Sequence, residues 1–258
     1  MRYVRPVDFA AFPPAAFHSQ RLADASTGLD SCICLCTRVP PGTGTTSGLH
    51  THPVDQLYYV LSGTMHARVG DRTLVVQPES LVIIPAGTPH WNWNEGTDDE
   101  VHFELIVPPP AAGQALVTPV GGEPESRPLP LEPVRTLQHA RFDPERFSQV
   151  VLADRSSGLE TLSLGVFRVP PGGHGPGLHM HRFDQIYYVY RGTMELEIGF
   201  ERYSVGAHTL VTIPAGMPHR NWNSGAEPEY HLNLRIPEPR GRDVVWDVPV
   251  TLGSEEAR

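Results

Sequence analysis

Histidine residues recur at matched spacing in the two halves of this 258-residue chain. The stretch GLHTHPVDQLYYV begins at Gly48, and GLHMHRFDQIYYV begins at Gly177. In each stretch two histidines are separated by one residue, and a glutamine follows the second histidine four residues later. Imidazole nitrogens bind Fe, Ni, Co, Cu, Mn and Zn. The pattern therefore predicts chemistry at a transition metal, once in each half.

A further histidine completes each set: His90 in PAGTPHWNWN and His219 in PAGMPHRNWN. Histidines two apart on a strand point to the same face, so three imidazoles and one amide oxygen can converge inside a barrel. We expect one divalent transition metal per half, with Fe(II) favoured and Ni, Co, Mn, Cu or Zn as alternatives. The expected ligands are His50, His52, Gln56 and His90 in the first half and His179, His181, Gln185 and His219 in the second. Buried or surface histidines that only form hydrogen bonds are the alternative, and the matched repetition favours the metal.

The glutamines make the expected ligand sets neutral. Glutamine supplies a carbonyl oxygen but accepts no proton at any useful pH, so a general base must come from elsewhere. Without ligand charge, a divalent ion should also act as a stronger Lewis acid. Candidates for the base, or for residues that orient the ligands, are His102, Glu104 and His231, with Asn233 and His66 also considered. Side chains expected to contact substrate are Tyr58, Trp91, Trp93, Tyr187, Arg220 and Trp222.

These residues lie in a tandem repeat that covers most of the chain. Residues from Val4 match residues from Val134 at an offset of 130, and the offset becomes 129 from the histidine motifs onward. We expect a first domain over 1–108 with its core at about 26–108, and a Pro/Gly-rich linker over 109–133. The second domain should then cover 134–258, with its core at about 156–238. Short β-branched segments bounded by Gly and Pro predict an all-β fold whose antiparallel strands close into barrels or jelly rolls.

The repeated motifs resemble those of the cupin superfamily. GLHTHPVDQLYYVLSG has the form G-x-H-x-H-x3-[E/Q]-x6-G, PAGTPHWNWN has the form P-x-G-x2-H-x3-N, and the second half satisfies both again. The resemblance implies a bicupin: two tandem cupin barrels of the double-stranded β-helix or jelly-roll type, each with one metal. Two departures stand out. Glu79 and His208 occupy the place where the second motif usually opens with glycine, and glutamine twice replaces the usual glutamate.

The same resemblance suggests a range of activities. The ligand set is most similar to that of the bicupin isomerase of the bacilysin pathway, and the fold is similar to bicupin dioxygenases and oxalate decarboxylases. Oxalate decarboxylases use glutamate as ligand and proton donor, so glutamine makes oxalate chemistry an unfavoured prediction. We expect an enzyme acting on an oxo acid, enediol or phenol, either as an isomerase or lyase or as a dioxygenase. The alternative is a non-catalytic bicupin that binds a metal or small ligand.

Composition and charge limit the classes of molecule that this chain is expected to bind. The net charge is −9 without a basic cluster, which argues against nucleic-acid binding. The N-terminus lacks an apolar signal region, and no run is long enough to span a membrane, so we expect a cytoplasmic monomer or homodimer with a small-molecule substrate. Cys32, Cys34 and Cys36 alternate along one segment, and we expect them to pack on the inward face of a strand.

Overall fold

The chain folds into two compact units, each described by itself. The structure is a computed structural model that describes residues 2–121, 129, 132–240 and 246–251. One unit contains Pro6–Gln138 and Leu152–Thr161, and is called the N-terminal unit. The other, the C-terminal unit, contains Met1–Arg5, His139–Val151 and Leu162–Arg258. The regular secondary structure of both units is almost entirely β-strand, which confirms the all-β prediction.

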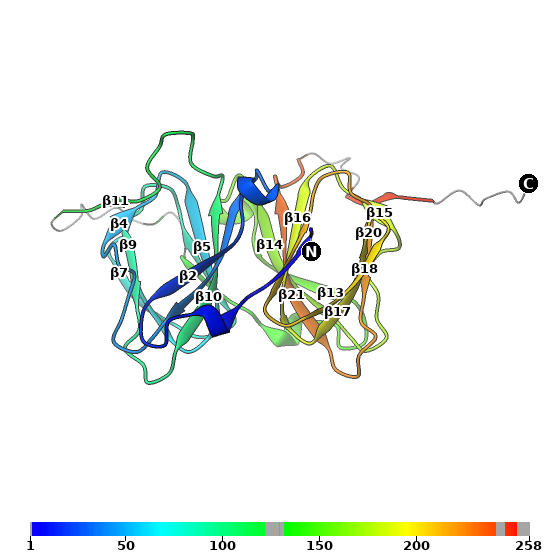
Figure 1. Ribbon diagram of the computed structural model, residues 1–258, viewed down its shortest axis with the longest axis horizontal. Helices are drawn as coiled ribbons and strands as arrows, with labels where there is room; N and C mark the ends of the chain where they lie inside the picture. Colours follow the sequence, from blue (N-terminus) through cyan, green and yellow to red (C-terminus); the bar gives the residue numbers. More distant parts are fainter. Residues whose placement is uncertain (1, 122–128, 130–131, 241–245, 252–258) are drawn as a thin grey trace, which may run out of the picture. The chain divides into compact units, whose positions relative to one another are not determined.

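The N-terminal unit contains two sheets (Figure 1). The six-stranded sheet has the order β12-β8-β5-β10-β3-β2, and the five-stranded sheet has the order β11-β4-β9-β6-β7. Two facing antiparallel sheets of this kind form the expected jelly roll. The strands are β2 (His18–Ala23), β3 (Ile33–Val39), β4 (His50–Thr51), β5 (Asp55–Ser62), β6 (Met65–Val69), β7 (Arg72–Val76), β8 (Ser80–Ile84), β9 (His90–Trp93), β10 (Glu100–Val107), β11 (Thr118–Pro119) and β12 (Val134–Thr136).

The C-terminal unit repeats this plan, as the tandem repeat predicts. Its six-stranded sheet has the order β1-β19-β16-β21-β14-β13, and its five-stranded sheet has the order β18-β17-β20-β15-β22. The strands are β1 (Val4–Pro6), β13 (Ser148–Ala153), β14 (Ser163–Val169), β15 (His179–Met180), β16 (Asp184–Arg191), β17 (Thr193–Ile198), β18 (Glu201–Gly206), β19 (Thr209–Ile213), β20 (His219–Trp222), β21 (Glu229–Ile236) and β22 (Val248–Pro249).

Helical structure in the described residues is limited to 3₁₀ turns. No helix there has the length and hydrophobicity to cross a bilayer. The turns are η1 (Phe9–Ala11), η2 (Ala25–Thr27), η3 (His139–Arg141) and η4 (Arg155–Ser157).

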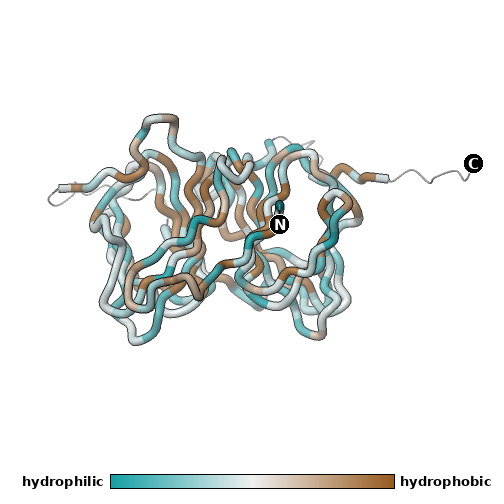
Figure 2. The backbone as a smooth tube through the Cα atoms, in the orientation of Figure 1, coloured by the Kyte–Doolittle hydropathy of each residue, from teal (hydrophilic) through white to brown (hydrophobic). Residues whose placement is uncertain are grey.

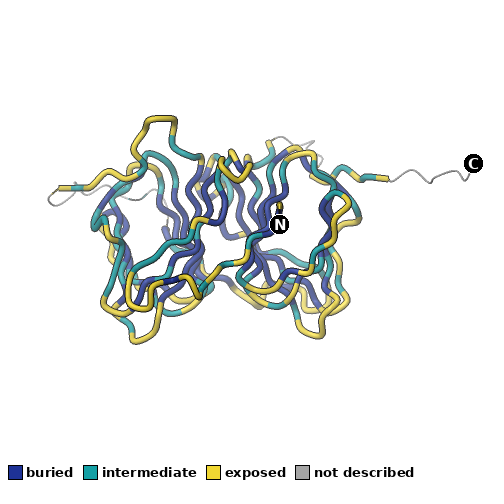
Figure 3. Tube along the Cα trace, in the orientation of Figure 1, coloured by how far each residue is buried: buried dark blue, intermediate teal, exposed yellow. Residues whose placement is uncertain are grey.

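Apolar side chains from both sheets form the core of each unit. The strands of the six-stranded sheets are largely hydrophobic in Figure 2 and buried in Figure 3. Burial of this apolar surface is the main force that closes the sheets on each other. The N-terminal cluster comprises Tyr58, Val60, Met65, Ala67, Val69, Val76, Val82 and Ile84. The C-terminal cluster comprises Tyr187, Val189, Met194, Leu196, Ile198, Val205, Val211 and Ile213, together with Tyr3 and Val4.

Two edge strands do not follow the order of the repeat. Strand β1, from the start of the chain, lies beside β19 in the C-terminal unit, where the carbonyl of Tyr3 accepts a hydrogen bond from the Thr212 amide at 2.9 Å. Strand β12 pairs with β8 of the N-terminal unit, with Val134 opposite Val82. Each unit thus includes an edge strand from outside the core range expected for it. Residues 122–128 and 130–131 of the expected linker lie outside the described residues.

The three cysteine side chains are buried and form no disulfide. This confirms that they pack in a core, but their direction differs from the expectation. Leu35 of β3 lines the interior cavity of the barrel described below. Because side chains alternate along a strand, Cys34 and Cys36 point to the opposite face of the sheet. The predicted inward direction was therefore wrong.

Candidate metal centres

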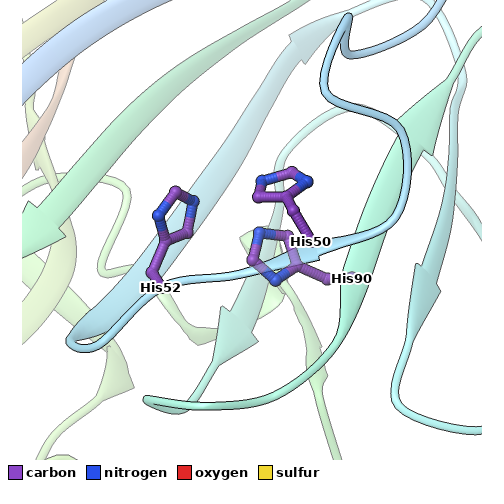
Figure 4. A group of neighbouring side chains, drawn as sticks. All are labelled: His50, His52 and His90. Atoms are coloured by element: carbon purple, nitrogen blue, oxygen red, sulfur yellow. The ribbon is translucent and has the colours of Figure 1, made fainter. Parts of the chain in front are cut away.

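Three imidazoles of the N-terminal unit gather at neighbouring strands of the five-stranded sheet. His50 lies in β4, His52 follows this strand directly, and His90 begins β9. His50 and His90 are opposite each other across the two strands, and their ring centroids are 4.3 Å apart. One nitrogen from each ring lies within 4.8 Å of the others, and Figure 4 shows the rings close together.

The hydrogen bonds of these rings determine which nitrogen is available. Each Nδ1 lies 2.7 to 2.9 Å from a backbone carbonyl oxygen. A carbonyl only accepts, so Nδ1 carries the proton and Nε2 presents a lone pair. The Nε2 atoms of His52 and His90 are buried without a hydrogen-bond partner. The carbonyls that orient the rings belong to Gly48, Leu116 and Thr88.

Gln56 is oriented in the same way. Its Nε2 donates to Oε1 of Glu104 at 2.5 Å, and its own Oε1 is buried without a partner. Thr37 donates to the other oxygen of Glu104 at 3.2 Å. Buried polar atoms are rarely left unpaired, and unpartnered acceptors next to three converging imidazoles match the donor set of a divalent transition metal. The residues therefore fit such an ion.

The C-terminal unit contains the same arrangement. One nitrogen from each of His179, His181 and His219 lies within 4.8 Å of the others. The Nε2 atoms of His181 and His219 and the Oε1 atom of Gln185 are buried without partners. Gln185 donates to the amide oxygen of Asn233 at 3.1 Å, where the N-terminal unit uses a carboxylate. The Nδ1 atoms of the three rings are held by the carbonyls of Gly177, Trp246 and Met217.

Burial keeps one imidazole of each cluster neutral. Burial, together with neighbouring His50, lowers the pKa of His90 to about 3. Burial likewise lowers the pKa of His219 to about 3, with His179 and His181 adding to the effect. Because only a neutral imidazole has a lone pair to donate, both rings are ready to bind a metal without first losing a proton.

Each imidazole cluster opens to a cavity of about 220 Å³. This is smaller than the sites that hold drug-sized ligands, so each cavity suits a small metabolite. The N-terminal cavity is lined by His50, His52, Gln56, Tyr58, His102, Glu104, Phe17, Ser19, Arg21, Leu35, Thr45, Thr46, Ser47, Asn92, Ile106, Leu116 and Val117. The C-terminal cavity is lined by His179, His181, Gln185, Tyr187, Phe147, Phe167, Pro176, Asn221, Asn233, Arg235, Trp246 and Asp247.

Two of the three expected proton-transfer residues line a cavity. His102 and Glu104 both lie in the N-terminal cavity, and Nδ1 of His102 is 3.0 Å from each carboxylate oxygen of Glu100. Burial lowers the pKa of His102, but the adjacent Glu100 raises it more, so the net shift is upward. For the Tyr58 hydroxyl, burial has the opposite effect and raises the pKa, so this hydroxyl remains a hydrogen-bond donor.

His231 has a different position. It pairs with Glu229 at 2.9 Å but is not among the residues that line the C-terminal cavity. Its ring packs against Tyr187 and Phe167, which do line the cavity. Of the expected substrate contacts, Tyr58 and Tyr187 lie in the cavities.

The structure does not bring the other four expected substrate contacts together with the imidazoles. Because His90 points inward, the alternation of β9 turns Trp91 and Trp93 outward, where they stack with centroids 4.6 Å apart. His66 stacks on Trp93 on that same outer face. Arg220 and Trp222 occupy the equivalent places on β20 and line a separate groove of about 440 Å³.

Sequence reasoning missed the segments that close each site. Strands β11 and β22 pair with β4 and β15, and the residues before them provide the carbonyls of Leu116 and Trp246 that orient a histidine. The first segment lies within the range 109–133 that the sequence predicts to be the linker. The similar tetrapeptides VTPV at 117–120 and DVPV at 247–250 could have indicated these two strands. Arg235 in the C-terminal cavity was also missed.

Comparisons with known proteins agree with this architecture. A family model for the cupin domain matches residues 36–108 and 165–232, together more than half of the chain. A Bacillus subtilis oxalate decarboxylase structure, studied for its Mn(II) centres, has a TM-score of 0.69 and 15% identity, covering 92% of this chain and 78% of that one. A cupin 2 conserved barrel domain protein from Leptotrichia buccalis has a TM-score of 0.63 and 12% identity, covering 90% and 96%.

At these identities the structural matches show a shared fold only, and the comparison with curated proteins found no significant match. The two matched segments each contain the first histidine pair, the glutamine and the later histidine of one repeat. The chain therefore belongs to the cupin superfamily, and because the cupin domain occurs twice it is a bicupin.

Proposed function

We propose that this bicupin is a metal-dependent enzyme that acts on a small oxygenated metabolite. One observation carries the proposal: in both units, buried imidazole and amide lone pairs without partners converge beside a cavity of about 220 Å³. A purely structural metal site is usually closed by its protein ligands, whereas these ligands border space for another molecule. That space supports a role in substrate binding over a role in stability alone.

The ligand set supports a divalent transition metal in each domain. Three imidazoles and an amide oxygen suit several first-row ions, and we propose Fe(II) as the native one. Mn(II) is the leading alternative, because the similar oxalate decarboxylase structure was studied for its Mn(II) centres. When bound, the ion would polarise a carbonyl or hydroxyl oxygen of the substrate.

We further propose that the N-terminal cavity carries out proton transfer, as in an isomerase or a lyase. Glu104 combines a carboxylate with a place in the cavity wall, and Gln56 and Thr37 fix its two oxygens. His102, held by the buried carboxylate of Glu100, places a second titratable group in the same wall. A positioned base of this kind can remove a proton next to a polarised carbonyl. The C-terminal cavity has Asn233 in place of Glu104, and the carboxylate in its lining, Asp247, comes from the residue before β22.

Metal analysis tests the first part. Protein purified under reducing conditions, and the same protein reconstituted with Fe(II), Mn(II), Co(II), Ni(II) or Zn(II), should hold two ions per chain. His90→Ala and His219→Ala should each hold one, and His66→Ala, outside both clusters, should hold two. Equal metal content in all four proteins would exclude these clusters as metal sites.

Activity measurements test the second part. Oxo acids, catechols and flavonols should be supplied to the metal-loaded protein while oxygen uptake, the ultraviolet spectrum and deuterium exchange are recorded. Exchange or a spectral change without oxygen uptake supports proton transfer, and Glu104→Gln should then reduce the rate about 100-fold or more. Oxygen uptake would favour the dioxygenase, which the same ligand set can accommodate. Absence of any reaction, with metal bound, would favour a non-catalytic binding protein.

A further inference from the structure

Arg235 places a positive charge in the wall of the C-terminal cavity. It lies on β21 directly opposite Gln185 of β16, and both side chains line the cavity. Residues directly opposite each other on adjacent strands have Cβ atoms about 5 Å apart on the same face of the sheet. The side chain of Arg235 therefore starts on the same face of the sheet as one of the proposed metal ligands.

The surroundings hold this side chain in place. The guanidinium carbon lies 5.7 Å from the ring centroid of Phe167 and 5.2 Å from that of Trp246. Nη2 donates to the amide oxygen of Gln149 at 3.0 Å. Gly165 gives the amide room, because a Cβ atom there would lie 2.4 Å from Nε2 of Gln149. Two aromatic rings, an amide and a glycine thus support one cation.

Burial disfavours this cation, and the groups that favour it act through space. Burial lowers the pKa of Arg235, while Tyr187, Asp247 and Glu238 raise it. The hydrogen bond to Gln149 uses one of five guanidinium donors and is to a neutral group. A desolvated cation is stabilised by an anion in the same low-dielectric space, and a planar guanidinium matches both oxygens of a carboxylate.

The N-terminal unit lacks this arrangement at every matched position. Ile106 stands opposite Gln56 where Arg235 stands opposite Gln185. Leu35 replaces Gly165, and Leu116 replaces Trp246 as the residue whose carbonyl orients the second histidine. An arginine directly opposite the glutamine is therefore present in the C-terminal cavity and absent from the N-terminal one.

The arginine that does line the N-terminal cavity has a different environment. The side chain of Arg21 is 54% exposed and pairs with Asp24 at 2.7 Å. Its charge is already compensated and solvated, and such surface pairs contribute little. The N-terminal cavity has the carboxylate of Glu104 beside Gln56, whereas the C-terminal cavity has Arg235 opposite Gln185 and the carboxylate of Asp247 near its histidines.

We propose that the C-terminal cavity binds the carboxylate of a small organic acid through Arg235. The rings of Phe147, Phe167 and Tyr187 pack against the apolar or aromatic body of this acid. The inference rests on the proposed function, since it names the substrate class of one of the two proposed sites. Arg235 is then a substrate-binding residue that selects acids over neutral molecules of the same shape.

Calorimetric titration with 3-phenylpropionate and with 3-phenylpropanamide tests this proposal. The two probes have the same shape, and only the first carries a charge. Wild-type protein should prefer the acid, and Arg235→Met, which retains an apolar stem, should weaken acid binding about 10- to 100-fold while leaving amide binding unchanged. Arg220→Met removes an equal charge from the outer face of β20 and should leave both affinities unchanged.

Metal-stripped protein separates this proposal from the proposed function. The ion pair with Arg235 needs no metal, so the preference for the acid should persist after chelation. Equal binding of acid and amide by the wild type, including no binding of either, overturns the inference, as does an acid affinity that Arg235→Met leaves unchanged. Acid binding that disappears with the metal would also overturn it. Failure to hold any metal would instead overturn the proposed function and leave the Arg235 preference measurable.

Discussion

At the scale of single residues, the partner of each glutamine distinguishes the two sites. Gln56 donates to the carboxylate of Glu104, whereas Gln185 donates to the neutral amide of Asn233. Both glutamines have a buried Oε1 atom without a hydrogen-bond partner, and both line the cavity that the histidines line. The two proposed ligand oxygens are therefore equivalent, but the group that accepts the hydrogen bond of the glutamine is charged in the N-terminal unit and neutral in the C-terminal unit.

This difference predicts unequal effects of adding a carboxylate ligand. Gln185→Glu should retain metal, because Asn233 can turn its amide to donate to the new carboxylate. Gln56→Glu should bind metal at least tenfold more weakly than Gln185→Glu, since two carboxylates at hydrogen-bonding distance repel each other. Competition with a chromogenic chelator at pH 7 measures both affinities. Equal affinities would show that Glu104 does not determine the choice of glutamine.

The depressed histidine pKa values predict a pH-dependent stability for the metal-free protein. His90 and His219 have a pKa of about 3 when folded and about 6.5 when unfolded. Between these values the unfolded chain binds more protons, so stability should fall as the pH decreases from 6.5 to 5. Each histidine contributes a slope of up to about 1.4 kcal/mol per pH unit.

Urea denaturation at several pH values in the presence of chelator measures this slope. His90→Gln should reduce the slope of the unfolding free energy against pH by the contribution of one histidine, up to about 1.4 kcal/mol per pH unit. His174→Gln is the control, because that ring is exposed and outside both clusters. An unchanged slope in His90→Gln would contradict the assignment.

At the scale of elements, the turn before the second motif explains an unusual feature of the sequence. Glu79 and His208 stand where cupin motifs usually have glycine, and they adopt φ values of 61° and 59°. This left-handed conformation costs a residue with a Cβ atom about 1 to 2 kcal/mol. The fold therefore retains the conformation of the glycine turn although the glycine has been replaced.

Substitution at Glu79 checks this account. Glu79→Gly should be more stable than Glu79→Ala by about 1 kcal/mol, because only glycine reaches this φ without strain. At Gln77, two residues earlier and without a positive φ, the order of glycine and alanine should be reversed. Chemical denaturation of the four variants gives both differences. The same order at the two positions would contradict the strain argument.

The elements also show how far the sequence could be interpreted. The strands and the convergence of the histidines could be predicted from the sequence. The histidine motifs occur twice at matched spacing, and side chains alternate between the two faces of a strand. The direction of Trp91 was not, since we assigned aromatic residues to the pocket by type, although alternation from His90 turns it outward. Arg235 was not predicted, because its counterpart in the first repeat is Ile106. The expected metal ligands lie where the two repeats carry the same residue, and at this position they differ. The strands β1 and β12 are too short to show a pattern.

At the scale of the whole molecule, the exchanged edge strands link the start of the chain to the C-terminal unit. Tyr3 and Val4 are buried in the core cluster of that unit. Tyr3 also bonds to Thr212 of β19 through its carbonyl. The C-terminal range 134–258 expected from the repeat therefore lacks part of its own core.

Removal of residues 1–6 should destabilise the C-terminal unit selectively. Two buried side chains contribute about 1.5 to 3 kcal/mol each, and β19 would lose its edge partner. Hydrogen exchange should show faster opening of β19 and β16, while β8 and β5 of the N-terminal unit remain protected. Tyr3→Ala should reproduce part of the effect without shortening the chain, and Arg2→Ala, at an exposed position, should not.

Metal content gives an independent measure of the same change, because the C-terminal ligands depend on the sheets that β1 completes. The shortened chain should retain the N-terminal ion and hold the C-terminal ion less tightly, since a loosened unit positions its imidazoles for less of the time. Supplying residues 1–8 as a free peptide should partly restore both protection and metal affinity. If exchange accelerated equally in both units, the strand would stabilise the chain as a whole, and the assignment of β1 to one unit would fail.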